Sequence, residues 1–327
     1  MRYERIDLSK ILQSGPEAGR FVFTFRPDLS DLVASIGKAG LLVPPVLRKR
    51  SPGEYQVVCG WRRIQALLRC GDESVEALVG SAEELNEEEC LRRSLLENRF
   101  HRGFNEIEKA LLFTRLQDEF SSLVPLLADV LEGDLKVPQE PGAQDNYRFL
   151  LALSPSIQEG LARDRISFGQ ALLLRAFPEE FQPLFYGLME GCGLNFQESR
   201  QAADWVQEIC KRDGKDPKRL LESLHLDDLL AGRMPPRKRA QALLAALRQK
   251  RFPVLESWKR RFDEACRLAS VEQDGVQIVS DPTFETTRIR FQISAASEEE
   301  LQSRLRALHQ AAQEGRMKGI FLAISVP

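Results

Sequence analysis

The stretch Val57-Val58-Cys59-Gly60-Trp61-Arg62-Arg63-Ile64 decides the fold of the N-terminal third of this chain. A short apolar run that ends at a glycine and continues at helical spacing predicts a strand followed at once by a helix, at 62–69. The glycine permits close approach to the backbone, and the helix start attracts anions. With two arginines that can fork onto phosphate oxygens, the junction is a candidate phosphate site. Solvated surface charge is the alternative interpretation of the arginine pair.

The segments around this junction predict a small mixed α/β domain between residues 6 and 79. Short apolar runs bounded by turn residues indicate strands, and an apolar face at helical spacing that ends at a glycine indicates a helix. The expected elements are a helix at 30–36 that ends at Gly37 or Gly40, strands at 44–48 and 55–59 joined by a turn at 51–54, and a strand at 75–79.

After residue 83 the pattern becomes mainly helical. Helices are expected at 87–97, 106–120, 146–151, 156–162, 167–176, 196–212 and 216–230, with an exposed acidic loop at 132–145. A hinge at 232–236 precedes two helices at 237–251 and 254–269. The end of the chain predicts a strand at 287–293 paired with 276–279, a helix opened by a capping box at 297–300, and a buried strand at 320–324.

Length and composition indicate a globular protein of two or three domains, with 327 residues and 43% hydrophobic residues. The six scattered cysteines contain no CxxC pair, which argues against a structural zinc site or a disulfide framework. No apolar run is long enough for a membrane span, so we expect a cytoplasmic protein without membrane contact. A net charge of −2 offers no general attraction for nucleic acid, so any DNA contact must come from local basic clusters.

Two further segments could complete a phosphate site. Glu97 and Asn98 place a carboxylate and an amide oxygen side by side at a helix end, which are ligands suited to magnesium; an ordinary helix cap is the alternative. His101 and Arg102 could add charge there, and the segment 40–45, which ends in two prolines, could hold a base or ribose or could simply connect a helix to a strand.

The order and spacing of these pieces resemble ParB-type chromosome or plasmid partition proteins. The similarity covers about residues 6–110 and rests on successive boxes at 6–11, 35–46, 57–66, 97–98 and 104–110, with a weaker continuation at 149–171. The resemblance implies a clamp that binds CTP and magnesium (Mg2+), closes as a homodimer around DNA, and reopens by slow CTP hydrolysis. It also implies nucleoid association and a ParA-type ATPase as a possible partner.

The resemblance also assigns site residues. It implies nucleotide binding by Gly40, Leu41, Pro44, Gly60, Trp61, Arg62, Arg63, His101 and Arg102, metal binding by Glu97 and Asn98, and catalysis by Glu97. The chain departs from the family pattern at three positions: Trp61 stands where a glutamate is usual, His101 where an arginine is usual, and Glu106 where a proline is usual. The absence of a carboxylate at position 61 is expected to weaken hydrolysis more than nucleotide binding.

The expected DNA-reading region is altered in this chain. An acidic loop repels phosphate, and near it only Arg148 and Lys136 offer positive charge. The strongest basic cluster lies at Arg233, Arg237, Lys238, Arg239, Arg248, Lys250, Arg251, Lys259, Arg260 and Arg261. This cluster could contact the DNA backbone without reading sequence, or it could be the solvated side of amphipathic helices.

The sequence therefore predicts an α+β chain with four parts. These are a ParB-like CTP-binding domain at 1–110, an all-α domain with a degenerate helix-turn-helix at 111–231, a basic hinge and helix at 232–252, and a small α/β C-terminal domain expected to dimerise at 253–327. Two functions stay open: a CTP-dependent DNA clamp, and a nucleotide-binding adaptor for protein partners that has lost specific DNA recognition. A sulfiredoxin-like enzyme is disfavoured because Cys59 precedes Gly60 instead of following it.

Overall fold

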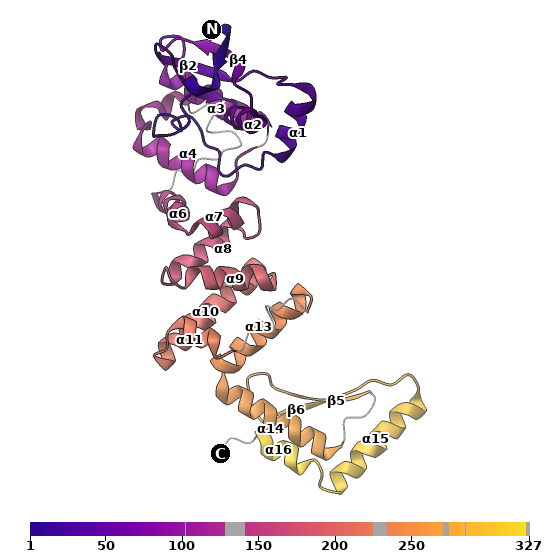
Figure 1. Cartoon of the computed structure of the whole chain (residues 1–327). Coiled ribbons are helices and arrows are strands. Elements are labelled where there is room, and N and C mark those ends of the chain that lie inside the picture. Colours follow the sequence, from indigo (N-terminus) through magenta and orange to yellow (C-terminus); the bar gives the residue numbers. More distant parts are fainter. Residues whose placement is uncertain (102, 128–140, 225–233, 271–274, 285, 325–327) are drawn as a thin grey trace. The chain divides into compact units, whose positions relative to one another are not determined.

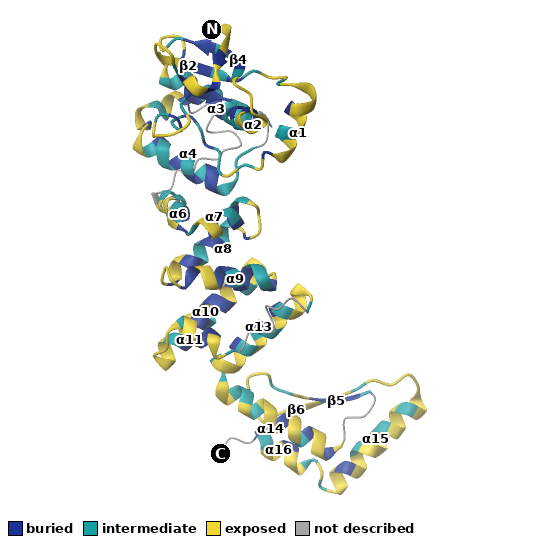
Figure 2. Cartoon of the chain, in the orientation of Figure 1, coloured by how far each residue is buried: buried dark blue, intermediate teal, exposed yellow. Residues whose placement is uncertain are grey.

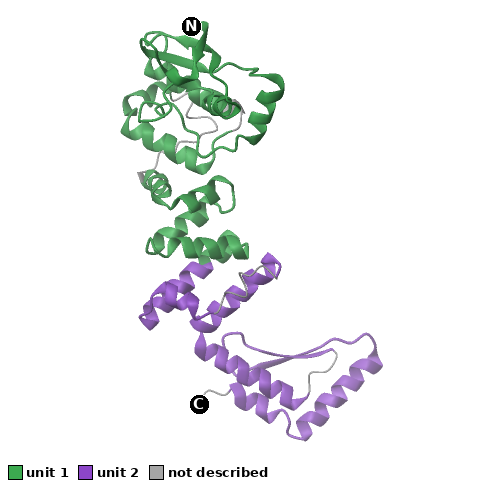
Figure 3. Cartoon of the chain, viewed as in Figure 1, with its two compact units in different colours: residues 1–200 green, residues 201–327 purple. Residues whose placement is uncertain are grey.

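The computed structural model describes residues 1–101, 103–127, 141–224, 234–270, 275–284 and 286–324 (Figure 1). The chain divides into two compact units, Met1–Arg200 and Gln201–Pro327 (Figure 3). The first unit begins with a mixed α/β domain and continues in helices, and the second is helical with one small sheet. The predicted α+β class is thereby confirmed.

A four-stranded mixed sheet organises the N-terminal domain. Its strands are β1 (Arg2–Asp7), β2 (Val46–Ser51), β3 (Glu54–Cys59) and β4 (Ser74–Gly80), in the order β1-β4-β2-β3. The pairs β1–β4 and β2–β3 are antiparallel, whereas β2 and β4 run parallel. Gly53 lies in the tight β2–β3 turn with a positive φ of 83°, a conformation that glycine adopts without strain. The sequence pattern predicted these strands except β1.

Helices cover both faces of this sheet, so β3 is buried from both sides (Figure 2). Tyr55 and Val57 pack in one core with residues of α1 (Ser30–Ala39) and α2 (Trp61–Cys70). Val58 packs in a second core with residues of α3 (Glu87–His101) and α4 (Glu106–Asp118). Successive strand side chains point to opposite faces, and each face is apolar here.

The rest of the first unit is helical, as predicted. Short 3-10 turns at Ser121–Leu123 and Pro125–Leu127 follow α4, and then come α6 (Pro141–Ala152), α7 (Pro155–Ala162), α8 (Phe168–Leu173), α9 (Gln182–Cys192) and the start of α10 (Phe196–Asp213). A capping box between Ser167 and Gln170 begins α8, and the buried Gln170 amide donates to Leu194 O and Ser199 Oγ, both at 2.8 Å. The helix α9 was not predicted.

The predicted loop at 132–145 is too long, because α6 already begins at Pro141. Proline suits the first turn of a helix, where its missing N–H would have no intrahelical partner, so a proline in a loop-like sequence can open a helix. Residues 128–140 lie outside the described part of the chain.

The second unit contains α11 (Pro217–Glu222), α13 (Pro236–Arg251), α14 (Pro253–Ala269), α15 (Glu298–Gln313) and α16 (Lys318–Ile324), with an antiparallel pair of β5 (Val276–Ser280) and β6 (Ile289–Ile293). The predicted β5–β6 pairing is confirmed. The predicted helix 216–230 is described only as α11, because residues 225–230 lie outside the description, as do residues 232 and 233 of the predicted hinge.

The predicted final strand at 320–324 is wrong, because these residues belong to the helix α16. Ile320 and Ile324 are buried while Phe321 and Leu322 are exposed, which is helical spacing. A five-residue apolar run fits either element, and packing of α16 against α14 decides for helix. The predicted capping box is half formed, since Ser297 accepts from Glu300 N but the Glu300 carboxylate accepts from Ala296 N.

Candidate functional site

A cavity of about 710 Å³ lies beside the Gly60 junction, which is within the range of small-molecule sites. It is lined by the end of β3, the start of α2, one side of α1, α3 and an irregular segment before α1. The lining residues are Phe21, Val22, Phe23, Thr24, Asp28, Asp31, Leu32, Ser35, Val43, Val58, Cys59, Gly60, Trp61, Arg62, Arg63, Ser94, Glu97 and Asn98. The arginine pair and the Glu97-Asn98 pair therefore meet at one cavity, as the sequence predicted.

Gly60 joins β3 to α2 in a left-handed conformation, with φ 87° and ψ 23°. A Cβ at this position would lie 2.8 Å from the Arg63 guanidinium, so a side chain here would push Arg63 away. The backbone N–H of Gly60 donates to Glu97 Oε2 at 3.0 Å. The glycine is required both for its own backbone conformation and for the position of Arg63.

Arg63 connects three parts of the cavity. Its guanidinium donates to Val43 O at 2.9 Å and to Pro44 O at 3.2 Å, and it forms an ion pair with Glu97. The side chains of Arg63 and Glu97 are only 14% and 24% exposed. Solvent therefore screens this pair less than a surface ion pair, and it fixes the segment before β2 against α2 and α3.

Arg62 extends from the same turn of α2 toward the other side of the cavity. Its guanidinium donates to Asp28 O at 2.9 Å, while its Nε is buried without a hydrogen-bond partner. A buried donor that lacks a partner costs free energy. Arg62 is therefore the cavity cation with an unused donor.

Glu97 and Asn98 stand at the cavity end of α3. The Asn98 Nδ2 donates to Ser94 O at 2.9 Å, which leaves the Oδ1 atom as the acceptor for a ligand. Both oxygens of Glu97 are engaged by Gly60 N and Arg63, so this carboxylate occupies the position predicted for an anion. Among the described residues no cluster of three or more acidic, histidine or cysteine ligands forms a ready metal site.

The charges lining the cavity do not favour a bare polyanion. Two arginines, Arg62 and Arg63, are opposed by three carboxylates, those of Asp28, Asp31 and Glu97. A triphosphate in this cavity would meet repulsion from the acids unless a divalent cation accompanied it. Glu97 and Asn98 supply oxygen donors suited to that cation, so the donor chemistry fits magnesium.

The other predicted nucleotide-binding residues lie differently. Trp61 lines the cavity and is partly buried against the α1–α2 core. Of the segment 40–45 only Val43 lines the cavity; Pro44 contributes its carbonyl to Arg63, Leu41 packs against the α1–α2 core, and Gly40 ends α1 with φ 71°. The side chain of His101 and all of Arg102 lie outside the described residues.

Sequence reasoning missed much of the cavity wall. Residues 12–29 contain neither helix nor strand, so no periodic pattern marked Phe21, Phe23 or Asp28 as site residues. Asp31 and Ser35 also line the cavity and are four residues apart on α1. The sequence could have indicated this pair only through its spacing, because side chains four residues apart lie on the same face of a helix.

Burial and the neighbouring Glu97 carboxylate raise the pKa of Cys59 far above its ordinary value. The thiolate is the reactive form, so this thiol stays protonated and unreactive at neutral pH. This result agrees with the low rank that the sequence gave to a sulfiredoxin-like mechanism.

We expect a thiol reagent such as DTNB at pH 8 to modify the exposed Cys70 quickly and Cys59 only on unfolding. The two sites are distinguished by mass spectrometry of tryptic peptides after quenching. Fast labelling of Cys59 in the folded protein would contradict the raised pKa.

The residues predicted to contact DNA are divided between the two compact units. Arg148 on α6 is paired with Asp118 at 2.6 Å, and both side chains are about half exposed. Arg237, Lys238 and Arg239 occupy the first turn of α13 in the second unit. Arg237 and Lys238 are exposed, whereas the Nε of Arg239 is buried without a hydrogen-bond partner.

Comparison with known proteins identifies the N-terminal domain. Residues 3–99 match the family model of the ParB N-terminal domain. The chain is 30% identical over 197 residues to the chromosome-partitioning protein ParB of Caulobacter vibrioides (strain NA1000 / CB15N), covering 59% of this chain and 60% of that protein. It is 30% identical over 167 residues to a probable chromosome-partitioning protein ParB of Chlamydia pneumoniae, covering 50% and 55%.

A solved structure of C-terminally truncated ParB from Caulobacter crescentus, complexed with CTP-gamma-S, is 26% identical and covers 56% of this chain and 98% of that chain, with a TM-score of 0.27. A TM-score this low defines no common arrangement, so the relationship rests on the sequence matches. The match spans 55% to 60% of the length of these two curated relatives. No helix in the described parts of the chain is both long and apolar enough to cross a membrane.

Proposed function

We propose that this chain, whose residues 3–99 match the ParB N-terminal domain, is a CTP-dependent, DNA-associated clamp of the partition type. In this proposal nucleotide binding shifts the population toward a closed homodimer. The same proposal includes a nucleoid location, a ParA-type ATPase as partner, and dimerisation through the C-terminal domain, where Leu301 and Leu305 of α15 are 38% and 48% exposed.

The observation that carries the proposal is the convergence of Gly60, Arg62, Arg63 and Glu97 on one cavity. A helix start with adjacent arginines supplies N–H donors and forked cations, which is the chemistry that recognises a phosphate chain. Val43, Trp61 and Phe23 give the same cavity an apolar part suited to a base or ribose. The resemblance to ParB proteins selects CTP among the nucleoside triphosphates.

Magnesium belongs to the proposal because the cavity alone does not neutralise a triphosphate. Asn98 Oδ1 and Glu97 would hold the cation, which would link the phosphates to α3 and reduce their repulsion by the acids. The Glu97 carboxylate already accepts hydrogen bonds from Gly60 N and from Arg63. Phosphate groups would therefore compete with this carboxylate for the same donors. Nucleotide binding would therefore release Glu97 toward the cation.

Slow hydrolysis, with Glu97 as the catalytic acid group, remains part of the proposal. The family glutamate next to Gly60 is replaced by Trp61, whose indole has no acceptor for a proton. We therefore expect this chain to bind nucleotide but to hydrolyse it more slowly than relatives that keep the carboxylate.

A second candidate function, the adaptor, is favoured by one observation. Arg148, the described cation nearest the altered DNA-reading region, is already paired with Asp118. Surface pairs of this kind contribute little to stability, yet the paired carboxylate offsets the positive charge that Arg148 offers to a phosphate backbone. An adaptor would retain the cavity and bind protein partners in place of a specific DNA site.

Calorimetric titration of the full chain with CTP, ATP, GTP and UTP, with and without magnesium, tests the proposal. We expect CTP binding that is much tighter with magnesium than without it, followed by gel shifts with palindromic duplexes that exceed those with random duplexes. Absence of binding by every nucleotide would overturn both candidates. CTP binding without any duplex shift would favour the adaptor.

A further inference from the structure

The cavity wall from Gly19 to Phe25 has an irregular backbone. This segment supplies Phe21, Val22, Phe23 and Thr24 to the lining, and the Phe21 and Phe23 side chains are fully buried. Residues 12–29 belong to no helix or strand, so sheet or helix ladders do not satisfy their backbone groups. Buried carbonyl and N–H groups need partners, which must come from elsewhere.

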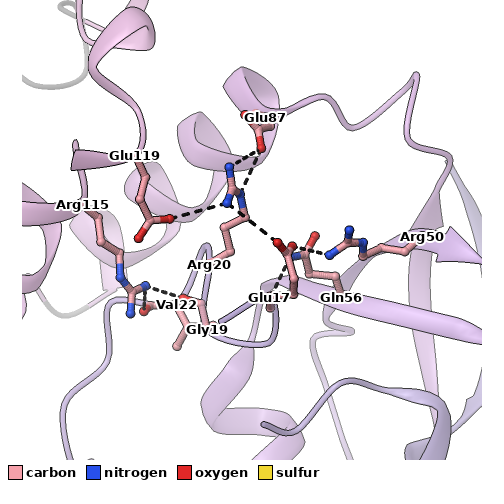
Figure 4. A network of polar contacts seen from close by, with 9 residues as sticks. All are labelled: Glu17, Gly19, Arg20, Val22, Arg50, Gln56, Glu87, Arg115 and Glu119. Atoms are coloured by element: carbon pink, nitrogen blue, oxygen red, sulfur yellow. Dashed lines mark hydrogen bonds and ion pairs between the residues drawn. The ribbon is translucent and has the colours of Figure 1, made fainter. Parts of the chain in front are cut away.

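Side chains of α3 and α4 provide these partners. Arg115 on α4 donates through one guanidinium nitrogen to Gly19 O and to Val22 O, the latter at 2.9 Å (Figure 4). Ser94 on α3 donates to Phe21 O at 2.7 Å, and Phe25 N donates to the Glu108 carboxylate at 3.0 Å. The wall is thus fixed to two helices at several points along its length.

Arg115 is the member of this set that holds two wall carbonyls at once. Its guanidinium also lies over the Phe23 ring, 5.5 Å from the centroid. Burial lowers the pKa of Arg115, and the nearby Glu119 opposes that change. Although its burial is unfavourable for a charged group, Arg115 contacts both the backbone and the Phe23 ring of the segment 19–25.

Arg20 offers a contrast within the same network. It pairs with Glu87 at 2.7 Å and approaches Glu119 at 3.6 Å and Glu17 at 3.9 Å, and it lies over the Phe120 ring at 4.9 Å (Figure 4). These partners are side chains and not wall carbonyls. Arg20 therefore binds the segment to α3 and α4 without setting the path of the backbone along the cavity.

We propose that Arg115 is a positioning residue of the nucleotide cavity, which fixes the path of residues 19–25 and with it the place of Phe21 and Phe23 in the lining. The inference rests on the proposed nucleotide-binding function. Arg115 is not among the residues that line the cavity, so it acts through the wall. Lysine cannot replace it fully, because an ammonium lacks the planar face that the guanidinium lays over the Phe23 ring.

The test compares the full-length variants Arg115→Ala, Arg115→Lys, Arg20→Ala and Arg165→Ala with wild type. Arg165, in the turn between α7 and α8, is paired with Glu190 of α9 at 3.0 Å, so it serves as a matched control. We expect Arg115→Ala to bind CTP with magnesium about tenfold more weakly, since two hydrogen bonds to part-buried carbonyls of the wall are lost. Arg115→Lys should recover part of that loss, and Arg165→Ala should bind as wild type.

Two measurements separate positioning from general stability. Melting temperature without nucleotide should fall for both Arg115→Ala and Arg20→Ala, but only the former should lose tenfold affinity. Millimolar guanidinium, well below denaturing concentrations, should restore CTP binding to Arg115→Ala and leave the affinity of Arg20→Ala unchanged.

Wild-type affinity in Arg115→Ala, or an affinity loss no larger than that of Arg20→Ala at equal loss of melting temperature, would overturn the inference. If wild type itself binds no nucleotide, the proposed function fails instead. If Arg115→Ala does not fold, Arg115→Lys carries the comparison, and wild-type affinity in that variant would equally overturn the inference.

Discussion

Replacing Arg63 by alanine is expected to reduce CTP binding by about 100-fold or more, because a charged donor to phosphate contributes about 1.5–3 kcal/mol and Arg63 can donate twice. The same change also removes the bonds to Val43 O and Pro44 O and leaves Glu97 without its cation. Calorimetric titration with CTP and magnesium gives the affinity.

Loss of the Arg63 bonds should lower stability as well, so a control is needed. Arg69→Ala removes an arginine from the other end of α2, where it is exposed. We expect this control to bind CTP as wild type does. Undiminished CTP binding by a folded Arg63→Ala protein would show that Arg63 serves only to hold Val43 and Pro44 in place.

Replacing Glu97 by glutamine is expected to change the metal dependence of binding in two directions. Without magnesium the variant should bind CTP about tenfold more tightly than wild type, because a negative charge near the phosphates is removed and Arg63 is released. With magnesium the advantage should disappear, because the neutral amide is a poorer ligand than a carboxylate. Titrations in EDTA and in magnesium measure both effects.

Glu89→Gln provides the control for the Glu97 experiment. Glu89 lies on the same helix and is paired with Arg93 at 2.6 Å, away from the cavity lining. It should leave both affinities unchanged. Weaker CTP binding by Glu97→Gln in EDTA would mean that the carboxylate does not compete with phosphate, and the present place of Glu97 would then be purely structural.

Much of the site followed from local sequence. Gly60 with the arginine pair and Glu97 with Asn98 were predicted because each combines a distinctive chemistry with a helix end, and their order along the chain resembles ParB proteins. The strands β2, β3 and β4 followed from short apolar runs bounded by turn residues. The strand β1 was missed because its exposed side chains, such as Tyr3 at 72% exposure, break the apolar pattern.

The remainder depended on contacts between distant residues. The run at 320–324 is helical because α14 offers a surface for Ile320 and Ile324. The wall at 19–25 acquires its path from Arg115 and Ser94, which are more than 70 residues away along the chain. No periodic pattern marks such a segment, since its backbone partners are side chains.

The sequence by itself determined that a candidate phosphate-binding turn, a neighbouring acid–amide pair and a mainly helical remainder occur in this order, because each depends on residues close together in the chain. Only the tertiary structure decided that Glu97 accepts from Gly60 N and that Arg115 donates to the carbonyls of Gly19 and Val22 in the cavity wall. Both contacts depend on how α3 and α4 pack against the sheet. Packing brings together charged groups and carbonyls that are far apart in the chain, and no sequence pattern predicts such contacts.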